Sequence, residues 1–201
     1  MPIHVEDLHK IRDKVKDYSH MYNIVLRLGS EAKGLKNIVK LERELSKVNN
    51  ILHKASGYRL WSAQKAWARR VLLGKSFAII APTGVGKTVF GIIMSLYNAS
   101  KGRKSYIILP TTPLVIQVTE KLLNYTTRAK LDDVKIINYH SKLSKSERKK
   151  AIKAIEEGEF DILVTTSKFL ALRFDILRGK KFDFIFVDDV DSILKSSKNI
   201  D

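Results

Sequence analysis

The sequence predicts an α/β fold in which helices flank a parallel sheet and a helical hairpin precedes that sheet. Three observations support this prediction. After Gly57, short β-rich runs alternate with helical stretches, as they do when helices connect parallel strands. A phosphate-binding pattern, Ala81–Thr88, follows one of the β-rich runs and begins a helix-like one. The first 56 residues show helical periodicity.

Residues 1–56 are expected to form the hairpin as a domain of their own. Within 5–28, apolar residues recur at spacings of three and four, at Leu8, Ile11, Val15, Tyr18, Tyr22 and Val25. Gly29 and Ser30 interrupt the pattern, and it resumes at Ile38, Leu41, Leu45, Val48 and Leu52. Such a seam is usually simple helix packing. A docking arm against a neighbouring domain is the alternative.

Residues 57–201 are expected to form a P-loop domain that is incomplete at its C-terminal end. The pattern predicts strands near 76–82, 105–110, 134–139, 161–166 and 182–189. Helices are predicted between them, near 87–100, 113–124, 144–157 and 167–176. Ligands of such sheets bind at the carboxyl ends of the strands, and the Ala81–Thr88 pattern falls at one of those ends.

The Ala81–Thr88 pattern predicts a nucleotide site. Gly84 and Gly86 allow the backbone to approach an anion, and the following helix directs its first amide groups toward it. Lys87 is expected to reach the β- and γ-phosphates, and the Thr88 hydroxyl to complete a magnesium site. The residues expected to bind the nucleotide in this loop are Pro82, Thr83, Gly84, Val85, Gly86, Lys87 and Thr88. ATP and Mg²⁺ are the expected cofactors.

An acidic run follows the last apolar stretch, where a magnesium ligand is needed. Asp188 is the expected ligand, acting through water because magnesium retains most of its hydration shell. Asp189 is expected to orient or deprotonate the attacking water. The alternative is that the run caps a helix beginning at Ser192.

Gln64 precedes the loop and is a candidate for adenine recognition. A glutamine amide both donates and accepts hydrogen bonds, which suits the Hoogsteen edge of adenine. The aromatic residues Tyr58 and Trp61 stand close to it in the sequence and could stack on a base. The alternative is that Trp61 and Trp67 belong to the core.

Two hydroxyl-rich segments stand where a predicted strand gives way to a helix. Their candidate nucleic-acid contacts are Thr111, Thr112, Gln117, Thr165 and Thr166. Helix capping is the competing explanation for both segments. A basic stretch lies between the two segments, and it is interpreted as a solvated helix face rather than a second contact surface. It comprises Lys142, Lys145, Arg148, Lys149, Lys150 and Lys153.

Charge and composition limit the class of protein. Basic residues outnumber acidic ones by 37 to 21, and the formal charge of +16 favours a polyanionic partner, most naturally nucleic acid. Lys-rich surfaces also occur in proteins from hot environments. The absence of cysteine excludes disulfides and thiolate zinc sites from these residues. No apolar run reaches membrane-span length and no signal peptide is recognisable, so a soluble cytoplasmic protein is expected.

Taken together, these motifs resemble those of superfamily 2 helicases. Gln64, Ala81–Thr88, 110–117, 165–166 and 188–191 are similar to the Q motif and motifs I, Ia, Ib and II, in that order. Most such helicases carry Asp-Glu at motif II, whereas this chain has Asp-Asp-Val-Asp, a variant that resembles the reverse gyrases. The segments 61–70 and 76–88 are similar to the same family. The resemblance covers 57–201 well and the hairpin only loosely.

The resemblance implies the first RecA-like domain of a helicase-like ATPase, which in reverse gyrases is joined to a type IA topoisomerase and introduces positive supercoils into DNA in hyperthermophiles. The expected partners are DNA, a second RecA-like domain and a topoisomerase domain. The family's Cys-rich zinc finger has no counterpart here, and motif III would follow Asp191 beyond the last residue, Asp201. Without the facing domain's arginine, the chain is expected to bind nucleotide but to hydrolyse it poorly.

Two other functions remain open. The chain could be a separate nucleotide- and DNA-binding subunit that completes or regulates a partner. It could also be a fragment of another superfamily 2 DNA or RNA helicase, although Asp189 in place of Glu argues against this.

Overall fold

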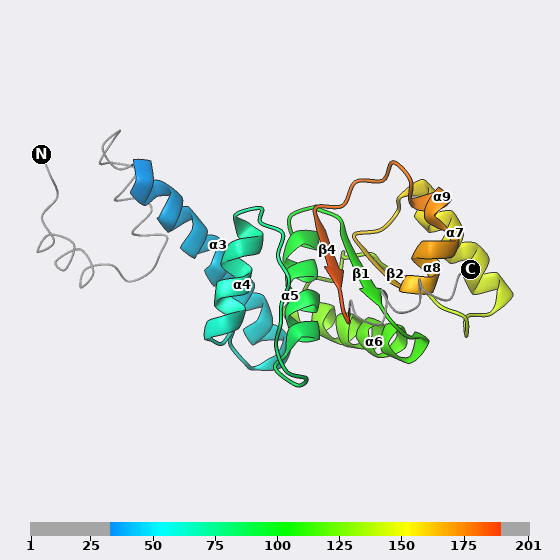
Figure 1. Cartoon of the computed structure of the whole chain (residues 1–201), viewed down its shortest axis with the longest axis horizontal. Helices are drawn as coiled ribbons and strands as arrows, with labels where there is room; N and C mark the ends of the chain where they lie inside the picture. The colour runs from blue at the N-terminus through cyan, green and yellow to red at the C-terminus, as the bar shows by residue number, and fades with distance from the viewer. Residues whose placement is uncertain (1–32, 190–201) are drawn as a thin grey trace, which may run out of the picture. The chain divides into compact units, whose positions relative to one another are not determined.

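The computed structural model describes residues 33–189, which include a four-stranded sheet with helices on both faces (Figure 1). The strands are β1 (Ser105–Leu109), β2 (Ile136–Tyr139), β3 (Ile162–Thr166) and β4 (Phe184–Val187). They lie in the order β2-β3-β1-β4, and all three pairings are parallel. This arrangement confirms the predicted α/β class with its helix-flanked parallel sheet.

The strand predicted near 76–82 is not formed, so that prediction was wrong. A strand is held by its ladder of backbone hydrogen bonds. Both sides of β1 are occupied, by β3 and β4, and no described residue pairs with the outer side of β4. The segment therefore enters the phosphate loop as irregular chain, and the side chain of Ile80 is 99% exposed.

The strands are buried between two helical layers. Helices α5 (Lys87–Ala99) and α6 (Thr112–Ala129) pack on one face of the sheet. Three helices cover the other face, and they are α7 (Lys145–Glu157), α8 (Ser167–Leu172) and α9 (Phe174–Leu177). Residues of β1 alternate between the layers, with Tyr106 and Ile108 packing in a core that includes Ile155 of α7 and Phe169 of α8. Central strands buried on both faces are typical of parallel sheets.

The helices begin and end for identifiable reasons. Ser144 and Glu147 form a capping box at the start of α7, and Gly158 ends that helix with a φ of 72°. The helix predicted over 167–176 is divided in the structure into α8 and α9. Arg173, between them, has a φ of −131°, which lies outside the helical range.

The N-terminal described helices are α3 (Lys33–Ser56) and α4 (Ser62–Leu72). Helix α3 confirms the second predicted helix of the hairpin, although Val39 is buried there and Ile38 is exposed. The helix predicted over 5–28 lies outside the described residues. The described chain divides into two compact units. The first comprises 33–49 and Leu60–Phe77, and the second comprises Asn50–Arg59 and 78–189. The boundary after residue 56 stays a prediction.

The unit that contains α4 is held by a bidentate ion pair. Arg69 donates to Glu42 from Nε at 2.6 Å and from Nη2 at 3.1 Å. The backbone amide of Leu60 donates to Asn49 Oδ1 at 2.9 Å. Within 33–189, no helix is both long enough and apolar enough to cross a membrane.

Candidate functional site

Polar residues follow all four strands at one edge of the sheet. Parallel strands place their carboxyl ends together, and the order β2-β3-β1-β4 sets the sequence of residues along that edge. Ser141 follows β2, Thr166 ends β3, Thr111 follows β1 and Asp188 follows β4. Of the predicted nucleic-acid contacts, Thr165 and Thr166 end the central strand β3, and Thr111 and Thr112 follow the central strand β1. The predicted metal ligand follows the neighbouring strand β4.

The phosphate loop enters α5 through two glycines with positive φ. The φ angles are 83° at Gly84 and 86° at Gly86, a region that residues with a side chain rarely adopt. Gly86 is the N-cap of α5, so the first amide groups of that helix open directly onto the loop. Helix starts of this kind bind phosphate through their free amides and the helix dipole.

Lys87 is folded back onto its own loop. Its Nζ donates to the carbonyl oxygen of Ala81 at 2.6 Å and to that of Pro82 at 3.0 Å. The ammonium group therefore lies within the concave side of the turn, where it holds the loop in shape. An ammonium there can exchange these neutral carbonyl acceptors for the more strongly accepting oxygens of a phosphate.

The two predicted magnesium ligands are in direct contact. Thr88 Oγ1 donates to Asp188 Oδ2 at 2.6 Å, across 100 residues of sequence. Asp188 is positioned by its own amide, which donates to the Ile108 carbonyl at 3.0 Å and so extends the β1–β4 pairing. A hydroxyl and a carboxylate at this separation supply the hard oxygen ligands that Mg²⁺ prefers.

Asp189 adopts a backbone conformation that is uncommon outside glycine. Its φ is 54° and its side chain is exposed. Aspartate tolerates this region better than most residues, but such conformations are concentrated at functional sites. Asp191, the third carboxylate of the run, lies outside the described residues.

Gly91 supports the site and was missed by the sequence reasoning. A methyl group at this position of α5 would lie 2.5 Å from Cδ1 of Phe186 on β4, well inside the range of ordinary contact. The absence of a side chain lets α5 approach β4 closely, which brings Thr88 within reach of Asp188. A glycine inside an apolar helix gives no local sign of this role, because only the packing partner reveals it.

Gln64 is placed in α4, within the first compact unit. Its side chain is buried, and Oε1 accepts a hydrogen bond from the Trp61 amide at 3.4 Å, which helps to begin the helix. The rings of Trp61 and Trp67 meet edge to face with centroids 6.1 Å apart. Adenine recognition by Gln64 stays a prediction.

The five predicted nucleic-acid contacts differ in exposure. Thr111 and Gln117 are exposed, and Thr112 shares a hydrogen bond of 3.2 Å with Ser141. Thr166 caps α8 by accepting from the Phe169 amide, as the alternative explanation required. Thr165 differs from the expectation because its side chain is fully buried.

The burial of Thr165 follows from the alternation of side chains along β3. Thr165 lies two residues after the core residue Leu163 and points to the same layer. There it shares a hydrogen bond of 2.7 Å with the Tyr106 hydroxyl. Burial raises the pKa of Tyr106 to about 12, although this hydrogen bond opposes the shift. The Thr165 side chain thus stabilises the core.

Comparison with known proteins identifies the domain. Residues 61–200 match the family model described as DEAD/DEAH box helicase. The chain is 47% identical over 190 residues to a reverse gyrase of Pyrococcus horikoshii, a match that covers 92% of this chain and 12% of that protein. A reverse gyrase of Thermococcus kodakarensis is 42% identical over all 201 residues, which are 11% of its length. Reverse gyrase 1 of Aquifex aeolicus is 48% identical over 166 residues, 83% of this chain and 14% of that protein.

Proposed function

The chain belongs to the DEAD/DEAH box helicase family, and we propose that it is the ATP- and DNA-binding part of the helicase-like module of a reverse-gyrase-type topoisomerase. It is similar to reverse gyrases and spans 11–14% of the length of these relatives. In the complete protein, ATP binding and hydrolysis by this module would drive positive supercoiling of DNA in the cytoplasm. The topoisomerase domain and a second RecA-like domain would be its partners.

The observation that carries the nucleotide proposal is the contact of 2.6 Å between Thr88 and Asp188. It joins the phosphate loop to the acidic run, which are the two parts that a nucleoside triphosphate with Mg²⁺ requires. Lys87 and the first amides of α5 would bind the phosphates, and Thr88 and Asp188 would hold the metal. When bound, Mg²⁺ would neutralise phosphate charge that Lys87 alone cannot balance. Asp189, one residue further on, would orient or deprotonate water.

Lys87, Thr88 and Asp188 fit that role without a preformed cluster of acidic or imidazole ligands in the described part of the chain. No group of three or more His, Cys, Asp or Glu side chains that could hold a metal occurs within 33–189. This suits a magnesium ion that is carried mainly by phosphate and water and is touched by few protein oxygens. We expect nucleotide binding without rapid turnover, because the arginine that stabilises transition-state charge in such ATPases comes from a facing domain.

Calorimetric titration of the chain with ATP, with and without Mg²⁺, tests the nucleotide proposal. Lys87→Ala removes a charge-assisted contact worth about 1.5–3 kcal/mol, so affinity should fall roughly 10- to 100-fold. Asp188→Asn should weaken binding in the presence of Mg²⁺ and leave metal-free binding nearly unchanged. Lys101→Ala removes an exposed lysine after α5 and is the matched control. Equal affinities of the Lys87→Ala and Lys101→Ala variants would contradict the proposal.

The nucleic-acid proposal has a separate test. Thr111 is exposed at the carboxyl edge of the sheet and Gln117 is exposed on α6, along which a nucleic-acid backbone would cross. We expect labelled duplex DNA to bind the chain and to be displaced more readily by DNA than by an RNA of the same sequence. Preferential displacement by RNA would favour a helicase that acts on RNA instead.

A further inference from the structure

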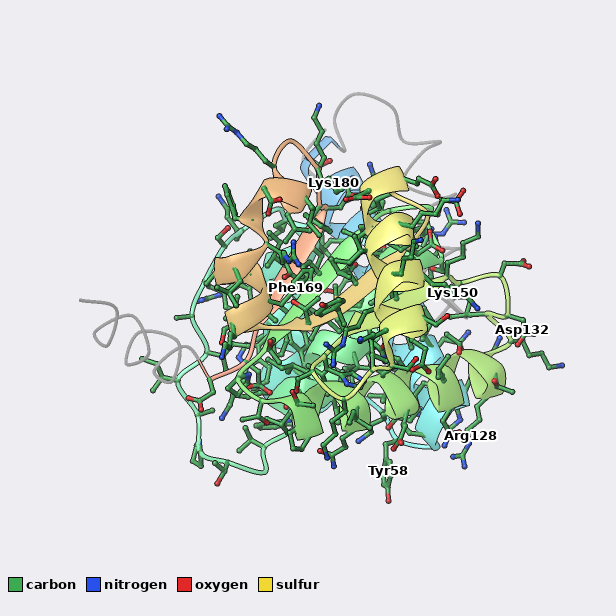
Figure 2. The ribbon with its side chains drawn as sticks, turned by 90° about the vertical axis from the view of Figure 1, so that its right-hand side faces the viewer. Tyr58, Arg128, Asp132, Lys150, Phe169 and Lys180 are labelled. Carbon is green, nitrogen blue, oxygen red and sulfur yellow. The ribbon has the colours of Figure 1, made fainter. Side chains whose placement is uncertain are left out.

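A basic groove lies between α7 and the junction of α8 with α9, at the β2 end of the sheet. Its volume is about 540 Å³. Five of the side chains that line it are cationic and one is acidic, namely Lys145, Arg148, Lys149, Lys153, Arg173 and Glu156. Figure 2 looks onto this face, with α7 in yellow beside α8 and α9 in orange and Phe169 labelled between them.

The lysines of the groove form a row along one face of α7. Lys145, Lys149 and Lys153 are four residues apart, and a helical rise of 1.5 Å per residue places the ends of the row about 12 Å apart. Like charges at this spacing destabilise a helix by a few tenths of a kcal/mol per pair. Within 33–189 an ion pair is formed only by Lys153 of these three, with Glu157 at 3.7 Å between largely exposed groups. The row is therefore poorly neutralised by the described chain.

Arg148 connects the row with the carboxyl edge of the sheet. Its Nη2 donates to the carbonyl oxygen of Ser141, and the Ser141 hydroxyl meets that of Thr112 at 3.2 Å. The Nε of Arg148 is buried and has no hydrogen-bond partner within the described part of the chain. Polar contacts thus continue from Thr112, one of the predicted nucleic-acid contacts, through Ser141 to the start of the groove.

The floor of the groove has an aromatic and an aliphatic side chain. Tyr139 and Ile152 line it, and the ring of Tyr139 packs on Phe169 with centroids 4.5 Å apart. Cations held above such a floor are positioned for surface binding of a long anion rather than enclosure of a small one. A DNA strand carries one negative charge per nucleotide, so each of the three lysines in the row can meet one phosphate.

We propose that this groove is a second nucleic-acid contact, in which α7 holds the phosphates of one DNA strand after that strand has crossed Thr112. The proposal rests on the proposed DNA-binding function and adds a site that was interpreted from sequence as a solvated helix face. The contacts are to phosphate, so the groove raises the affinity for DNA and directs the course of the strand over the protein, but it does not read the base sequence.

The salt dependence of DNA binding by the 201-residue chain tests this proposal. Binding of a fluorescein-labelled duplex is measured over a series of NaCl concentrations for the unaltered chain and for the triple variant Lys145→Gln, Lys149→Gln, Lys153→Gln. Affinity falls as salt rises, and each lost phosphate contact makes the plot of log affinity against log salt less steep by about 0.9. The magnitude of the slope should therefore decrease by up to about 2.7 in the triple variant. The substitutions are exposed and conserve helix propensity, and circular dichroism checks the fold.

A charge-matched variant is the control. Lys54→Gln, Lys101→Gln, Arg103→Gln removes three exposed charges of the same compact unit that lie outside the groove. Its slope should equal that of the unaltered chain. An unchanged slope in the groove variant, or an equal decrease in the slope of both variants, would overturn the proposal that the groove binds DNA. Failure of the unaltered chain to bind DNA at low salt would overturn the proposed DNA-binding function, and the groove with it.

Discussion

Gly91→Ala gives a sharp test of how the phosphate loop is joined to the acidic run. The added methyl group would lie 2.5 Å from Cδ1 of Phe186 and 2.6 Å from its Cγ, whereas ordinary contact begins at 3.4 Å. Both α5 and β4 are buried at this point, so the ring cannot simply turn into solvent. The helix and the strand must separate, and with them Thr88 and Asp188.

Two opposing terms set the magnitude of this effect. Overpacking a well-packed core costs about 1–3 kcal/mol. Replacing glycine by alanine inside a helix favours folding by about 1 kcal/mol. In the Phe186→Ala background all three close contacts are removed, so only the favourable helix term remains. The double-mutant cycle cancels helix propensity and isolates a coupling of about 1–3 kcal/mol.

Thermal unfolding followed by circular dichroism measures this coupling. For a chain of about 200 residues, 1 kcal/mol shifts the midpoint by about 2–4 °C, so the coupling corresponds to roughly 2–12 °C. Gly91→Ala should lower the midpoint, or leave it unchanged, in the unaltered chain and raise it in the Phe186→Ala background. Equal positive shifts in both backgrounds would refute the close packing of α5 on β4. Magnesium-dependent ATP affinity should fall together with stability in the single variant.

Three further outcomes are expected from other contacts. Thr88→Val should weaken magnesium-dependent ATP binding more than Thr88→Ser, as calorimetry can show, because only serine retains a hydroxyl for Asp188. Ser144→Ala should cost about 1 kcal/mol in urea unfolding, since the Ser144 hydroxyl no longer accepts from the Glu147 amide at the start of α7. The backbone amide of residue 144 still donates to the Glu147 carboxylate, so half of the capping box is retained. Tyr106 is buried with a pKa of about 12, so its contribution to the free energy of unfolding should be complete below pH 10 and lost as pH rises toward 12. Tyrosinate absorbance can follow the ionisation of this side chain, with Tyr106→Phe as the control.

Much of the site could be predicted because its parts are local. The glycines, Lys87 and Thr88 form a contiguous pattern whose chemistry depends on a turn followed by a helix, and both are present. Asp188 follows a strand whose apolar run is plain in the sequence. Their contact of 2.6 Å depends on the packing of α5 against β4.

The remaining features depend on partners that lie far away in the sequence. The role of Gly91 depends on Phe186, and no local pattern connects the two. The segment 76–82 has strand-like composition, but no described strand forms backbone hydrogen bonds with it. Thr165 could have been assigned to the core, because side chains alternate along a strand and Leu163, two residues earlier, is apolar.

Within 33–189 nothing pairs with the outer side of β4, and this bears on how the chain will behave in solution. Ile185 on that strand is 53% exposed, and Ile80 in the irregular segment before the phosphate loop is 99% exposed. A strand edge without a partner is a template onto which another polypeptide can add by backbone hydrogen bonding, and exposed apolar side chains favour such association. The high positive charge opposes such self-association only while salt is low, because ions screen repulsion between copies. Precipitation at high ionic strength is therefore expected for this chain, and dilute, low-salt buffers are the conditions in which to study it.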